Sequence, residues 1–433
     1  MHQPEFEMME RDQLEALQVS RLRDLVQRVY ENVPAYRTKF DTAGVSPGDV
    51  NALTDVANLP FTVKDDLRAA YPYQMFAVPL SEIVRVHSSS GTTGQITVVG
   101  YTREDIDDWS DMVARAIGAA GLGAQDVMQV AYGYGLFTGG LGLHYGAERI
   151  GATAVPVSGG NTRRQVQILQ DFGVTGLACT PSYALVIAEQ ARELGVDTAS
   201  LPVRAGIFGA EPWTEQMRDQ LQRELGIKAY DIYGLSEVMG PGVGYECEAQ
   251  AGLHINEDHF LVEVVDPETL EVLPDGEYGE VVFTTLTKRG IPLIRYRTRD
   301  ISRIIPGECS CGRTFRRLQR LTGRSDDMLI IRGVNVYPSQ IEQVLVGVRG
   351  VSPHYQIFLT KDGSLDAVEV RVELDPEFDF DEIRSVQTVA REIRAAITSS
   401  LAISVEVRIV EPKSLARSEG KIPRVVDLRN KEA

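Results

Sequence analysis

Residues 83–94 read Ile-Val-Arg-Val-His-Ser-Ser-Ser-Gly-Thr-Thr-Gly, a strand-like run followed directly by a loop with five hydroxyls and two glycines in seven residues. Backbone N–H and side-chain O–H groups of such a loop can converge on one anion, because no bulky side chain blocks its approach. A phosphate site is therefore predicted at Ser88, Ser89, Ser90, Gly91, Thr92, Thr93 and Gly94. The loop is not a Walker loop, since Gln95 replaces the lysine that should follow the last glycine. The general alternative is a flexible Ser/Gly turn.

Composition and charge narrow the classes of protein. The chain has 433 residues, of which 43% are hydrophobic and 24% charged, as is typical of a globular protein with a large core and two or three compact units. No apolar run approaches the about 18 residues of a membrane span, and the acidic N-terminus lacks the pattern of a signal peptide. A net charge of −17 argues against nucleic acid as a partner. We expect a cytoplasmic protein that binds neither nucleic acid nor membrane.

Strand-like and helix-like segments alternate between about residues 83 and 240. The expected strands are 126–131, 152–156, 176–180, 203–208 and 228–233, and the expected helices are 104–119, 162–171, 182–194 and 214–225. Such alternation predicts parallel sheets with helices on their faces. The fold class expected is therefore α/β, with a large N-terminal domain of parallel or mixed sheets flanked by helices.

The pattern changes after residue 255. Segments 260–265 and 279–285 flank a Pro-Asp-Gly turn and predict a β-hairpin, so a β-rich part is expected at about 255–320. Later strand-like segments at 327–332, 354–359, 366–374 and 404–410 surround helices at 338–347 and 380–400. We predict that residues 1–325 form the N-terminal domain and residues 326–433 a small, mobile α+β C-terminal domain.

Three further segments carry groups suited to a nucleotide site. Asp231-Ile-Tyr-Gly-Leu-Ser-Glu237 ends a predicted strand, and ligands of open α/β sheets bind beyond the carboxyl ends of strands. A base could stack on Tyr233 and Glu237 could hold Mg²⁺; taken alone, Tyr233 also fits a core residue and Glu237 a solvated turn. Asp300, expected after a strand, could bind both ribose hydroxyls or pair with nearby arginines. Lys421 lies in a Gly-flanked loop, where a lone lysine is usually solvated.

The four cysteines are too few for a disulfide-built scaffold in a chain of this length. Cys309 and Cys311 form a tight Cys-Ser-Cys-Gly segment, and His254 follows Cys247 by seven residues. These four side chains could make a closed, structural Cys3His zinc site. The spacing is unlike a regular zinc finger, so free thiols in turns are an equal alternative.

Taken in order, these segments resemble the adenylate-forming superfamily, which includes the acyl-coenzyme A synthetases, and within it most closely the phenylacetate–coenzyme A ligase family. The likeness covers nearly the whole chain. Its most specific part is Gly323-Arg-Ser-Asp-Asp-Met-Leu-Ile-Ile-Arg-Gly-Val-Asn-Val-Tyr-Pro338, and it also includes Phe61–Leu67, Tyr132–Gly140, Phe208–Trp213 and the segments above.

The resemblance implies a role for each matching residue. The loop Ser88–Gly94 would hold the β- and γ-phosphates of ATP, and Lys421 would contact the carboxylate and the α-phosphate during adenylation. Glu237 would be the Mg²⁺ carboxylate, Asp300 the ribose ligand and Asp326 the hinge. The remaining nucleotide-binding residues would be Gly209, Ala210, Glu211, Pro212, Asp231, Ile232, Tyr233, Gly234, Ser236 and Arg324. Some superfamily members bind zinc in the region of Cys247, His254, Cys309 and Cys311, which favours the metal interpretation.

The acid substrate is expected to lie among aromatic walls with small neighbours, which suit a flat aryl ring. The pocket is predicted at Lys64, Tyr132, Tyr134, Phe137, Thr138 and Gly139. Lys64 matches a family residue near the acyl carboxylate, although a solvated lysine at a helix start is as plausible. Phenylacetate is the leading acid; benzoate, anthranilate or a hydroxyphenylacetate stays open, because one methylene or hydroxyl discriminates by only about 1–3 kcal/mol.

The implied reaction is an AMP-forming acid–thiol ligation that uses ATP, Mg²⁺ and coenzyme A, in a homodimeric enzyme with a structural Zn²⁺. A carrier protein as acyl acceptor, or a nucleotide sensor without chemistry, are the alternatives; a sensor would be expected to lack Lys421 or Glu237. We also expect the basic run Arg313, Arg316, Arg317, Arg320 and Arg324 to attract the phosphates of coenzyme A.

Overall fold

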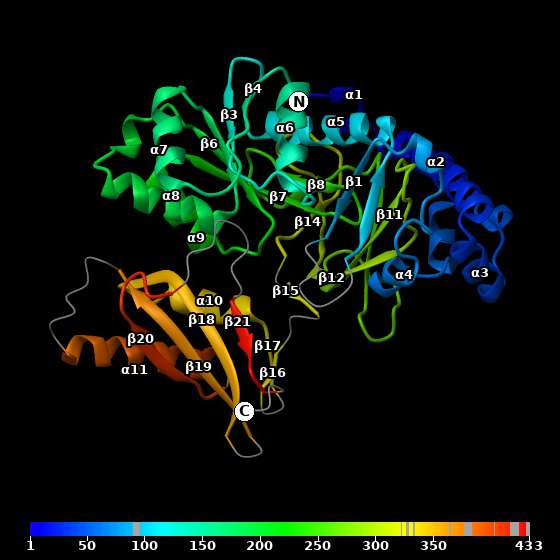
Figure 1. The fold of residues 1–433 in the computed structure, drawn as a ribbon. Coiled ribbons are helices and arrows are strands. Elements are labelled where there is room, and N and C mark those ends of the chain that lie inside the picture. The colour runs from blue at the N-terminus through cyan, green and yellow to red at the C-terminus, as the bar shows by residue number, and fades with distance from the viewer. Residues whose placement is uncertain are drawn as a thin grey trace.

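The computed structural model describes residues 1–89, 96–321, 323–325, 329–331, 334–362, 365–375, 383–401, 403–415 and 424–429. A large body of sheets and helices lies above a smaller unit formed by the C-terminal part of the chain (Figure 1). The predicted α/β fold class is confirmed. Within the described residues, no helix combines the length and the apolar character that a membrane span needs.

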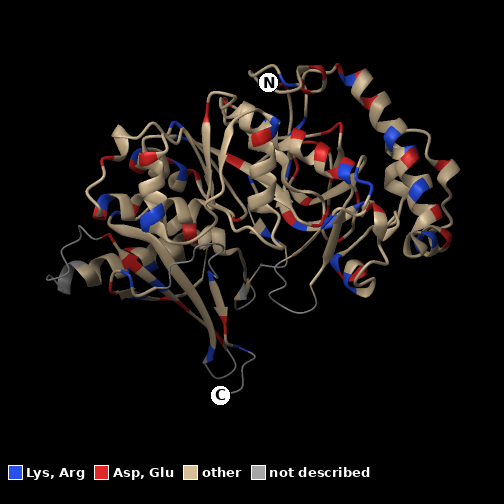
Figure 2. Cartoon of the chain, turned by 45° about the horizontal axis from the view of Figure 1, so that its top comes forward, with Lys and Arg blue, Asp and Glu red and all other residues tan. Residues whose placement is uncertain are grey.

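The N-terminal segment is helical, as its apolar spacing predicts. Its elements are α1 (Pro4–Glu7), α2 (Arg11–Asn32), α3 (Pro34–Ala43), α4 (Lys64–Ala69) and the 3₁₀ turns η1 (Pro47–Asp49), η2 (Leu53–Asn58) and η3 (Leu80–Glu82). Helix α2 buries Leu14, Leu22 and Leu25 on one face, the face that a period of 3.6 residues brings together. Gln18 is also buried on this helix, because its amide donates to the carbonyl oxygen of Glu257 at 2.8 Å. In Figure 2, the positions of acidic and basic residues are interspersed along the ribbon of α2.

A nine-stranded mixed sheet forms the centre of the large body. Its strand order is β13-β14-β9-β8-β7-β6-β5-β3-β4. The strands are β3 (Val127–Val130), β4 (Thr153–Val155), β5 (Gly176–Cys179), β6 (Ala205–Gly209), β7 (Lys228–Leu235), β8 (Gly240–Glu246), β9 (Leu253–Ile255), β13 (Ile304–Ile305) and β14 (Arg317–Leu318). Strands β3 to β7 pair in parallel, and β7 to β9 are antiparallel. The parallel half therefore aligns the carboxyl ends of β3, β5, β6 and β7 at one edge.

Helices connect the parallel strands. They are α5 (Arg103–Ala119), α6 (Gly139–Arg149), α7 (Thr162–Asp171), α8 (Pro181–Glu193) and α9 (Glu215–Leu225), with the turn η4 (Thr198–Ser200). Side-chain oxygens of Thr102, Asn161, Thr180 and Thr214 cap the first turns of α5, α7, α8 and α9, which fixes where these helices begin. A core around Tyr183, Phe208 and Leu221 joins α7–α9 to β5 and β6.

The β-rich part contains the predicted hairpin strands with the predicted bounds. A second sheet has the order β10-β11-β12-β15 and consists of β10 (Phe260–Val265), β11 (Gly279–Thr285), β12 (Tyr296–Ser302) and β15 (Gly323–Arg324). A short sheet pairs β1 (Arg85–Ser88) with β2 (Val98–Tyr101). Asp300 was expected after a strand, and this was wrong: it lies inside β12, because the segment pairs with β11 and β15 on either side.

The C-terminal part has its own sheet and core. Its elements are β16 (Leu329–Ile331), β17 (Val334–Val336), α10 (Pro338–Val346), β18 (Val351–Asp362), β19 (Leu365–Leu374), α11 (Ile383–Leu401), β20 (Glu406–Val410) and β21 (Val425–Asp427). The sheet order is β20-β19-β18-β21. Ile341, Val370 and Ile393 belong to a hydrophobic cluster formed within this part, so it is an α+β unit as expected. The predicted boundary at 325/326 stays a prediction, since Asp326 lies outside the described residues.

Candidate active site

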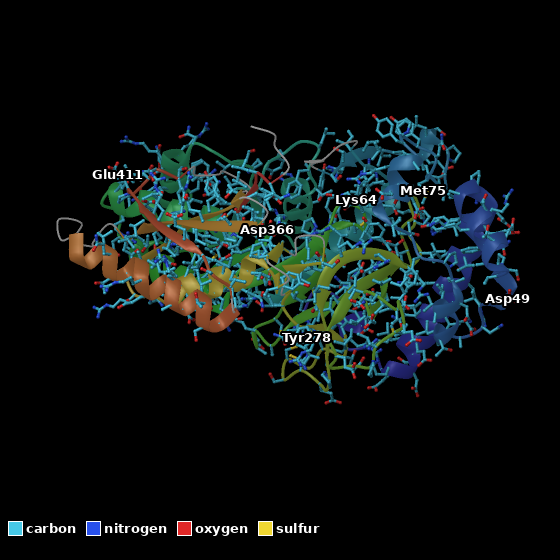
Figure 3. All side chains as sticks on the ribbon, turned by 90° about the horizontal axis from the view of Figure 1, so that it is seen from below. Asp49, Lys64, Met75, Tyr278, Asp366 and Glu411 are labelled. Carbon is cyan, nitrogen blue, oxygen red and sulfur yellow. The ribbon has the colours of Figure 1, made fainter. Side chains whose placement is uncertain are left out.

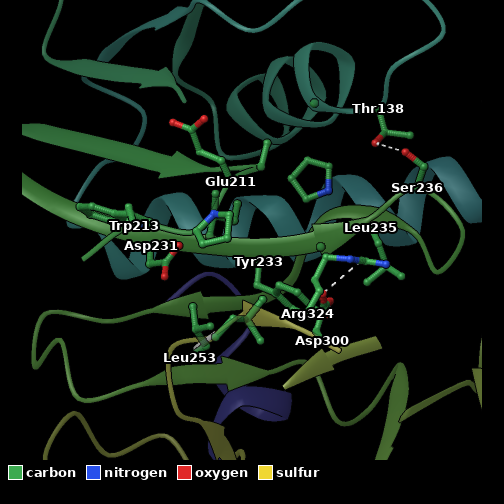
Figure 4. Close-up of a pocket in the computed structure, with 18 of the residues that line it drawn as sticks. Thr138, Glu211, Trp213, Asp231, Tyr233, Leu235, Ser236, Leu253, Asp300 and Arg324 are labelled. Atoms are coloured by element: carbon green, nitrogen blue, oxygen red, sulfur yellow. Dashed lines mark hydrogen bonds and ion pairs between the residues drawn. The ribbon is translucent and has the colours of Figure 1, made fainter. Parts of the chain in front are cut away.

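A cavity opens at the edge of the central sheet where parallel strands end. Tyr132 follows β3, Glu211 follows β6 and Glu237 follows β7, and all three line this cavity. The pairing of β12 with β15 adds Asp300 and Arg324 to the lining from the second sheet. Figure 4 shows these elements around one space. The topology thus brings together residues that are far apart in sequence.

Only the start of the predicted phosphate loop is described. The Ser88 amide donates to the carbonyl oxygen of Leu136 at 3.0 Å, and the Ser89 amide donates to that of Thr97 at 3.2 Å. The hydroxyls of Ser89 and Thr97 are 2.6 Å apart, and Ser89 lines the cavity. The predicted residues Ser90, Gly91, Thr92, Thr93 and Gly94 lie outside the described residues, as do Asp326 and Lys421.

Glu237 lies in the turn directly after β7, as predicted for the metal carboxylate. Its side chain is nearly buried, and Lys64 Nζ lies 3.2 Å from Glu237 Oε1. The Thr97 hydroxyl donates to the same oxygen at 3.3 Å. A chain of contacts therefore connects Lys64, Glu237, Thr97 and Ser89. Figure 3 shows Lys64 near the middle of the molecule, at the beginning of α4.

The segment 209–212 forms one wall of the cavity with its backbone. Gly209 packs so closely that a Cβ there would lie 2.1 Å from the carbonyl oxygen of Ile232, so only glycine fits between the strands. The Glu211 carboxylate accepts from the Ser182 amide at 2.8 Å, in the first turn of α8. Burial raises the pKa of Glu211. The Glu211 carboxylate therefore ties this wall of the cavity to the first turn of α8.

Asp231 and Trp213 lie on the same side (Figure 4). Trp213 is flanked by two guanidinium groups, with Arg320 4.5 Å and Arg218 5.2 Å from the ring centroid. Burial and the carboxylate of Glu246 raise the pKa of Asp231 to about 8. Arg320 Nε lies 3.4 Å from Asp231 Oδ2. This side of the cavity is therefore a rigid aromatic and charged wall.

Asp300 is held from both sides. Tyr233 Oη donates to Asp300 Oδ2 at 2.6 Å, and Arg324 Nη1 lies 3.2 Å from Asp300 Oδ1. Tyr233 lines the cavity as predicted, and its ring packs 6.1 Å from that of Phe283. Its pKa is raised well above the ordinary value by burial and the Asp300 carboxylate. The three side chains fix one carboxylate at the cavity wall.

The predicted acid pocket is brought together except at one position. Lys64, Tyr132, Phe137, Thr138 and Gly139 line the cavity, and the hydroxyls of Thr138 and Ser236 are 3.0 Å apart. Tyr134 was predicted here and is not among the lining residues. Its hydroxyl instead lies 3.3 Å from His144 Nδ1, because its ring packs against the imidazole from α6. Ile232, Gly234 and Ser236 line the cavity as well.

The three cysteines and the histidine singled out in the sequence meet in space. Their ligand atoms all lie within 4.8 Å of one another. Cys247 Sγ is 3.7 Å from Cys309 Sγ, and Cys311 Sγ is 3.4 Å from His254 Nε2. Tetrahedral bonds of about 2.3 Å to zinc place sulfurs about 3.8 Å apart, so the spacing and the soft donor set fit this metal. His254 Nδ1 lies 3.2 Å from the Phe315 carbonyl oxygen, a contact that orients the imidazole.

The basic run predicted to attract coenzyme A does not form one exposed patch, and a contribution of the half-exposed Arg316 and Arg324 stays a prediction. Arg313 is buried, and its Nε donates to Glu7 Oε2 at 2.6 Å. Arg317 is buried as well, with its guanidinium on backbone carbonyls. Arg320 Nη1 lies 3.0 Å from Glu215 Oε1. Carboxylates pair with Arg313 and Arg320, and backbone carbonyls bind Arg317, so these three guanidinium groups do not form an exposed basic surface.

Two residues of the site could not be recognised from the sequence. Thr97 binds Glu237 across 140 residues of chain, and Lys288, which is fully buried, donates to the backbone of the same turn. Burial lowers the pKa of Lys288 to about 7, although the Asp105 and Glu237 carboxylates act to raise it. A threonine and a lysine in such surroundings resemble ordinary strand and loop residues until the tertiary contacts are known.

Residues 28–286 match the AMP-binding enzyme family. The chain belongs to the AMP-binding enzyme family. Residues 333–429 match the AMP-binding enzyme C-terminal domain. The resemblance inferred from the sequence is confirmed by curated members of this family.

Two of these relatives are similar over nearly their whole length. The chain is 54% identical to phenylacetate–coenzyme A ligase of Escherichia coli (strain K12), over 97% of this chain and 96% of that protein. It is 50% identical to phenylacetate–coenzyme A ligase of Thermus thermophilus, over 99% and 100% respectively.

Solved structures of one AMP-binding relative also compare well. The structure of 2-hydroxyisobutyryl-CoA ligase in its postadenylation state, with R3-HIB-AMP, superposes with a TM-score of 0.92 at 31% identity, covering 98% of this chain and 91% of that one. The same ligase with 2-HIB-AMP and CoA in the thioesterification state gives 0.73 at 32% identity, with coverage of 99% and 92%. The coverage is nearly the same in the two comparisons, whereas the TM-scores differ.

Proposed function

We propose that this AMP-binding enzyme activates an aryl carboxylic acid with ATP and transfers the acyl group to coenzyme A, with phenylacetate as the leading acid. The products would be the acyl-coenzyme A, AMP and pyrophosphate. The observation that carries this proposal is the single cavity in which Tyr132 and Phe137 lie together with Glu237 and Asp300. Four curated relatives at 50–54% identity, all phenylacetate–coenzyme A ligases, support the same activity.

Different residues of the cavity would serve different parts of the first half-reaction. Asp300, fixed by Tyr233 and Arg324, would bind the ribose hydroxyls, and Ser89 would begin the phosphate loop. Lys64 Nζ would orient the acid carboxylate toward the α-phosphorus, which shortens the approach and excludes water. Glu237 would hold Mg²⁺, whose charge offsets the charge that develops on the phosphoryl oxygens.

The second half-reaction would need a change of domain arrangement. Lys421, proposed as the adenylation lysine, and Asp326, proposed as the hinge, both belong to segments outside the described residues. The higher TM-score with the postadenylation state of 2-hydroxyisobutyryl-CoA ligase than with its thioesterification state supports assigning the present arrangement to the first stage. Rotation of the C-terminal part would then admit coenzyme A to the acyl-adenylate.

The Cys3His cluster is proposed to hold a structural Zn²⁺, with all four protein ligands supplied by Cys247, His254, Cys309 and Cys311. Such a closed site leaves no position for substrate, so its contribution would be to stability. A cytoplasmic location and a homodimer stay predictions.

An acid-dependent pyrophosphate-exchange assay tests this function. Phenylacetate should stimulate exchange into ATP more than benzoate, anthranilate or hydroxyphenylacetate, and addition of coenzyme A should release phenylacetyl-coenzyme A. If no carboxylic acid stimulates exchange, the proposal is wrong. If exchange occurs and only a phosphopantetheinylated protein accepts the acyl group, the enzyme loads a carrier protein instead.

A further inference from the structure

The turn that carries Glu237 is bound from inside the protein by two side chains. Lys288 Nζ donates to the carbonyl oxygen of Glu237 at 3.2 Å and to that of the next residue, Val238, at 2.9 Å. The Tyr101 hydroxyl donates to the Met239 carbonyl oxygen at 2.7 Å and makes a longer contact of 3.4 Å with the Ser236 carbonyl oxygen. The four bound carbonyls are those of Ser236, Glu237, Val238 and Met239.

Lys288 is an unusual choice for this position. Its side chain is fully buried, and its Nζ lies 4.6 Å from the centroid of the buried Tyr101 ring. No carboxylate forms an ion pair with it among the residues that the structure describes. A buried amine without a carboxylate partner is costly in free energy, so a neutral residue would be expected if packing were its only task.

The direction of the contacts indicates what Lys288 does. It holds the backbone of the turn on the buried side, while the Glu237 carboxylate lies on the cavity side, against Lys64 and Thr97. The amine keeps two N–H donors whether it is protonated or neutral, so both carbonyl contacts persist in either state. The Val238 and Met239 amides already donate to the carbonyl oxygen of Leu235, and Lys288 adds a second restraint at the carbonyl oxygens of Glu237 and Val238.

We propose that Lys288, together with Tyr101, is a positioning residue for the reaction: it fixes the turn 236–239 so that the Glu237 carboxylate points at the metal and phosphate position. The inference rests on the proposed role of Glu237 as the Mg²⁺ carboxylate. Mutation of a residue that orients a metal ligand typically lowers metal affinity by about 10- to 100-fold. A carboxylate whose position is loose by about 1 Å loses much of its effect.

The test compares Lys288→Met with Lys228→Met, a control at an exposed lysine. Lys228 also donates to a backbone carbonyl, that of Glu248 at 2.7 Å, and lies 5.5 Å from the Tyr230 ring centroid, but it does not line the cavity. Mn²⁺ serves as a spectroscopic probe: its affinity for the full-length protein with a non-hydrolysable ATP analogue is measured by electron paramagnetic resonance. Pyrophosphate exchange is measured in parallel, with separate KM and kcat values.

Lys288→Met should weaken Mn²⁺ binding by about 10- to 100-fold and lower kcat, with the KM for the acid unchanged, whereas Lys228→Met should leave all three quantities unchanged. Folded Lys288→Met with wild-type Mn²⁺ affinity would overturn the inference. If Lys288→Met does not fold, Tyr101→Phe removes only the hydroxyl and should weaken Mn²⁺ binding in the same direction; unchanged affinity there would also overturn it. Wild-type protein that binds no metal–nucleotide would instead overturn the proposed function on which the inference rests.

Discussion

Lys64 Nζ lies 3.2 Å from Glu237 Oε1, so an ammonium and a carboxylate that are far apart in sequence meet in the cavity. Lys64 begins α4, and Glu237 follows β7. The pair is compatible with two different tasks, since the ammonium can turn to an acid substrate once a divalent cation neutralises the carboxylate.

Glu237→Gln should lower the kcat of pyrophosphate exchange by at least about 100-fold, because the amide cannot supply a charged ligand to Mg²⁺. The shape of the side chain is preserved, so the free energy of unfolding should change little. Steady-state exchange at several Mg²⁺ concentrations measures the effect. A variant with wild-type kcat at low Mg²⁺ would contradict the assignment.

Lys64→Met should affect the acid more than the nucleotide. Loss of a charge-assisted contact costs about 1.5–3 kcal/mol, so we expect the KM for the acid to rise at least about tenfold while the KM for ATP stays within about twofold. Lys228→Met is the control. Equal effects on both substrates would indicate that Lys64 acts only on Glu237.

Asp300→Asn should raise the KM for ATP by about tenfold or more, because the hydrogen bonds from ribose hydroxyls to a carboxylate weaken when the charge is removed. Tyr233→Phe removes the 2.6 Å hydrogen bond to Asp300 and keeps the carboxylate, so it should give a smaller increase. KM values for ATP and for the acid, measured for both variants, test this order. A larger effect of Tyr233→Phe would show that the hydroxyl itself binds the nucleotide.

Removal of the proposed zinc ion should destabilise the fold without abolishing the active-site geometry. Cys309→Ser or Cys311→Ser should reduce bound zinc from one ion per chain to none and lower the free energy of unfolding by about 3 kcal/mol, the effect of a ligand present at about 100 times its Kd. Cys179→Ala is the control, since Cys179 is buried outside the cluster. Elemental analysis and denaturant unfolding give the two measurements; folded wild-type protein free of zinc would refute the site.

Much of the central sheet could be predicted from sequence, because local signals and tertiary structure agree there. The helix predicted at 162–171 has those bounds in the structure, since Asn161 caps its first turn. Strand β7 continues to Leu235, and this places Glu237 at its carboxyl end as expected. The same alternation of apolar strands and capped helices locates the ends of β3 and β6, so the general place of the site could be predicted as well.

The elements that were missed depend on close packing. Helix α6 contains Gly142 and Gly146, where a Cβ would lie 2.6 Å from Trp109 and 2.3 Å from Val113. These glycines lower intrinsic helix propensity while allowing α6 to approach α5, and single-sequence periodicity cannot reveal that benefit. The same holds for the contacts of Thr97 and Lys288, which depend on backbone carbonyls and carboxylates brought near by the whole fold.

Acid should weaken the fold through the buried pair of Asp258 and Arg115. Arg115 donates to both carboxylate oxygens of Asp258 at 2.8 Å, and both side chains are 1% exposed. Burial alone would raise the pKa of Asp258, but His259 and Arg115 lower it to about 2 from an ordinary value of 3.8. Because the folded-state pKa is the lower one, the stabilisation is complete above the unfolded-state value and is lost as pH falls from about 4 through about 2.

The lowered pKa of Asp258 corresponds to about 2 kcal/mol in the free energy of unfolding, which is lost on acidification. Asp258→Asn removes the titrating group and leaves the Arg115 guanidinium without its charged partner, which should cost about 3–5 kcal/mol near neutral pH. The difference in the free energy of unfolding between wild type and this variant should therefore narrow by about 2 kcal/mol as pH falls from about 5 to about 2. Urea unfolding at several pH values measures it, with Asp65→Asn, whose side chain is 84% exposed, as the control. A difference that stays constant with pH would show that Asp258 keeps an ordinary pKa in the folded protein.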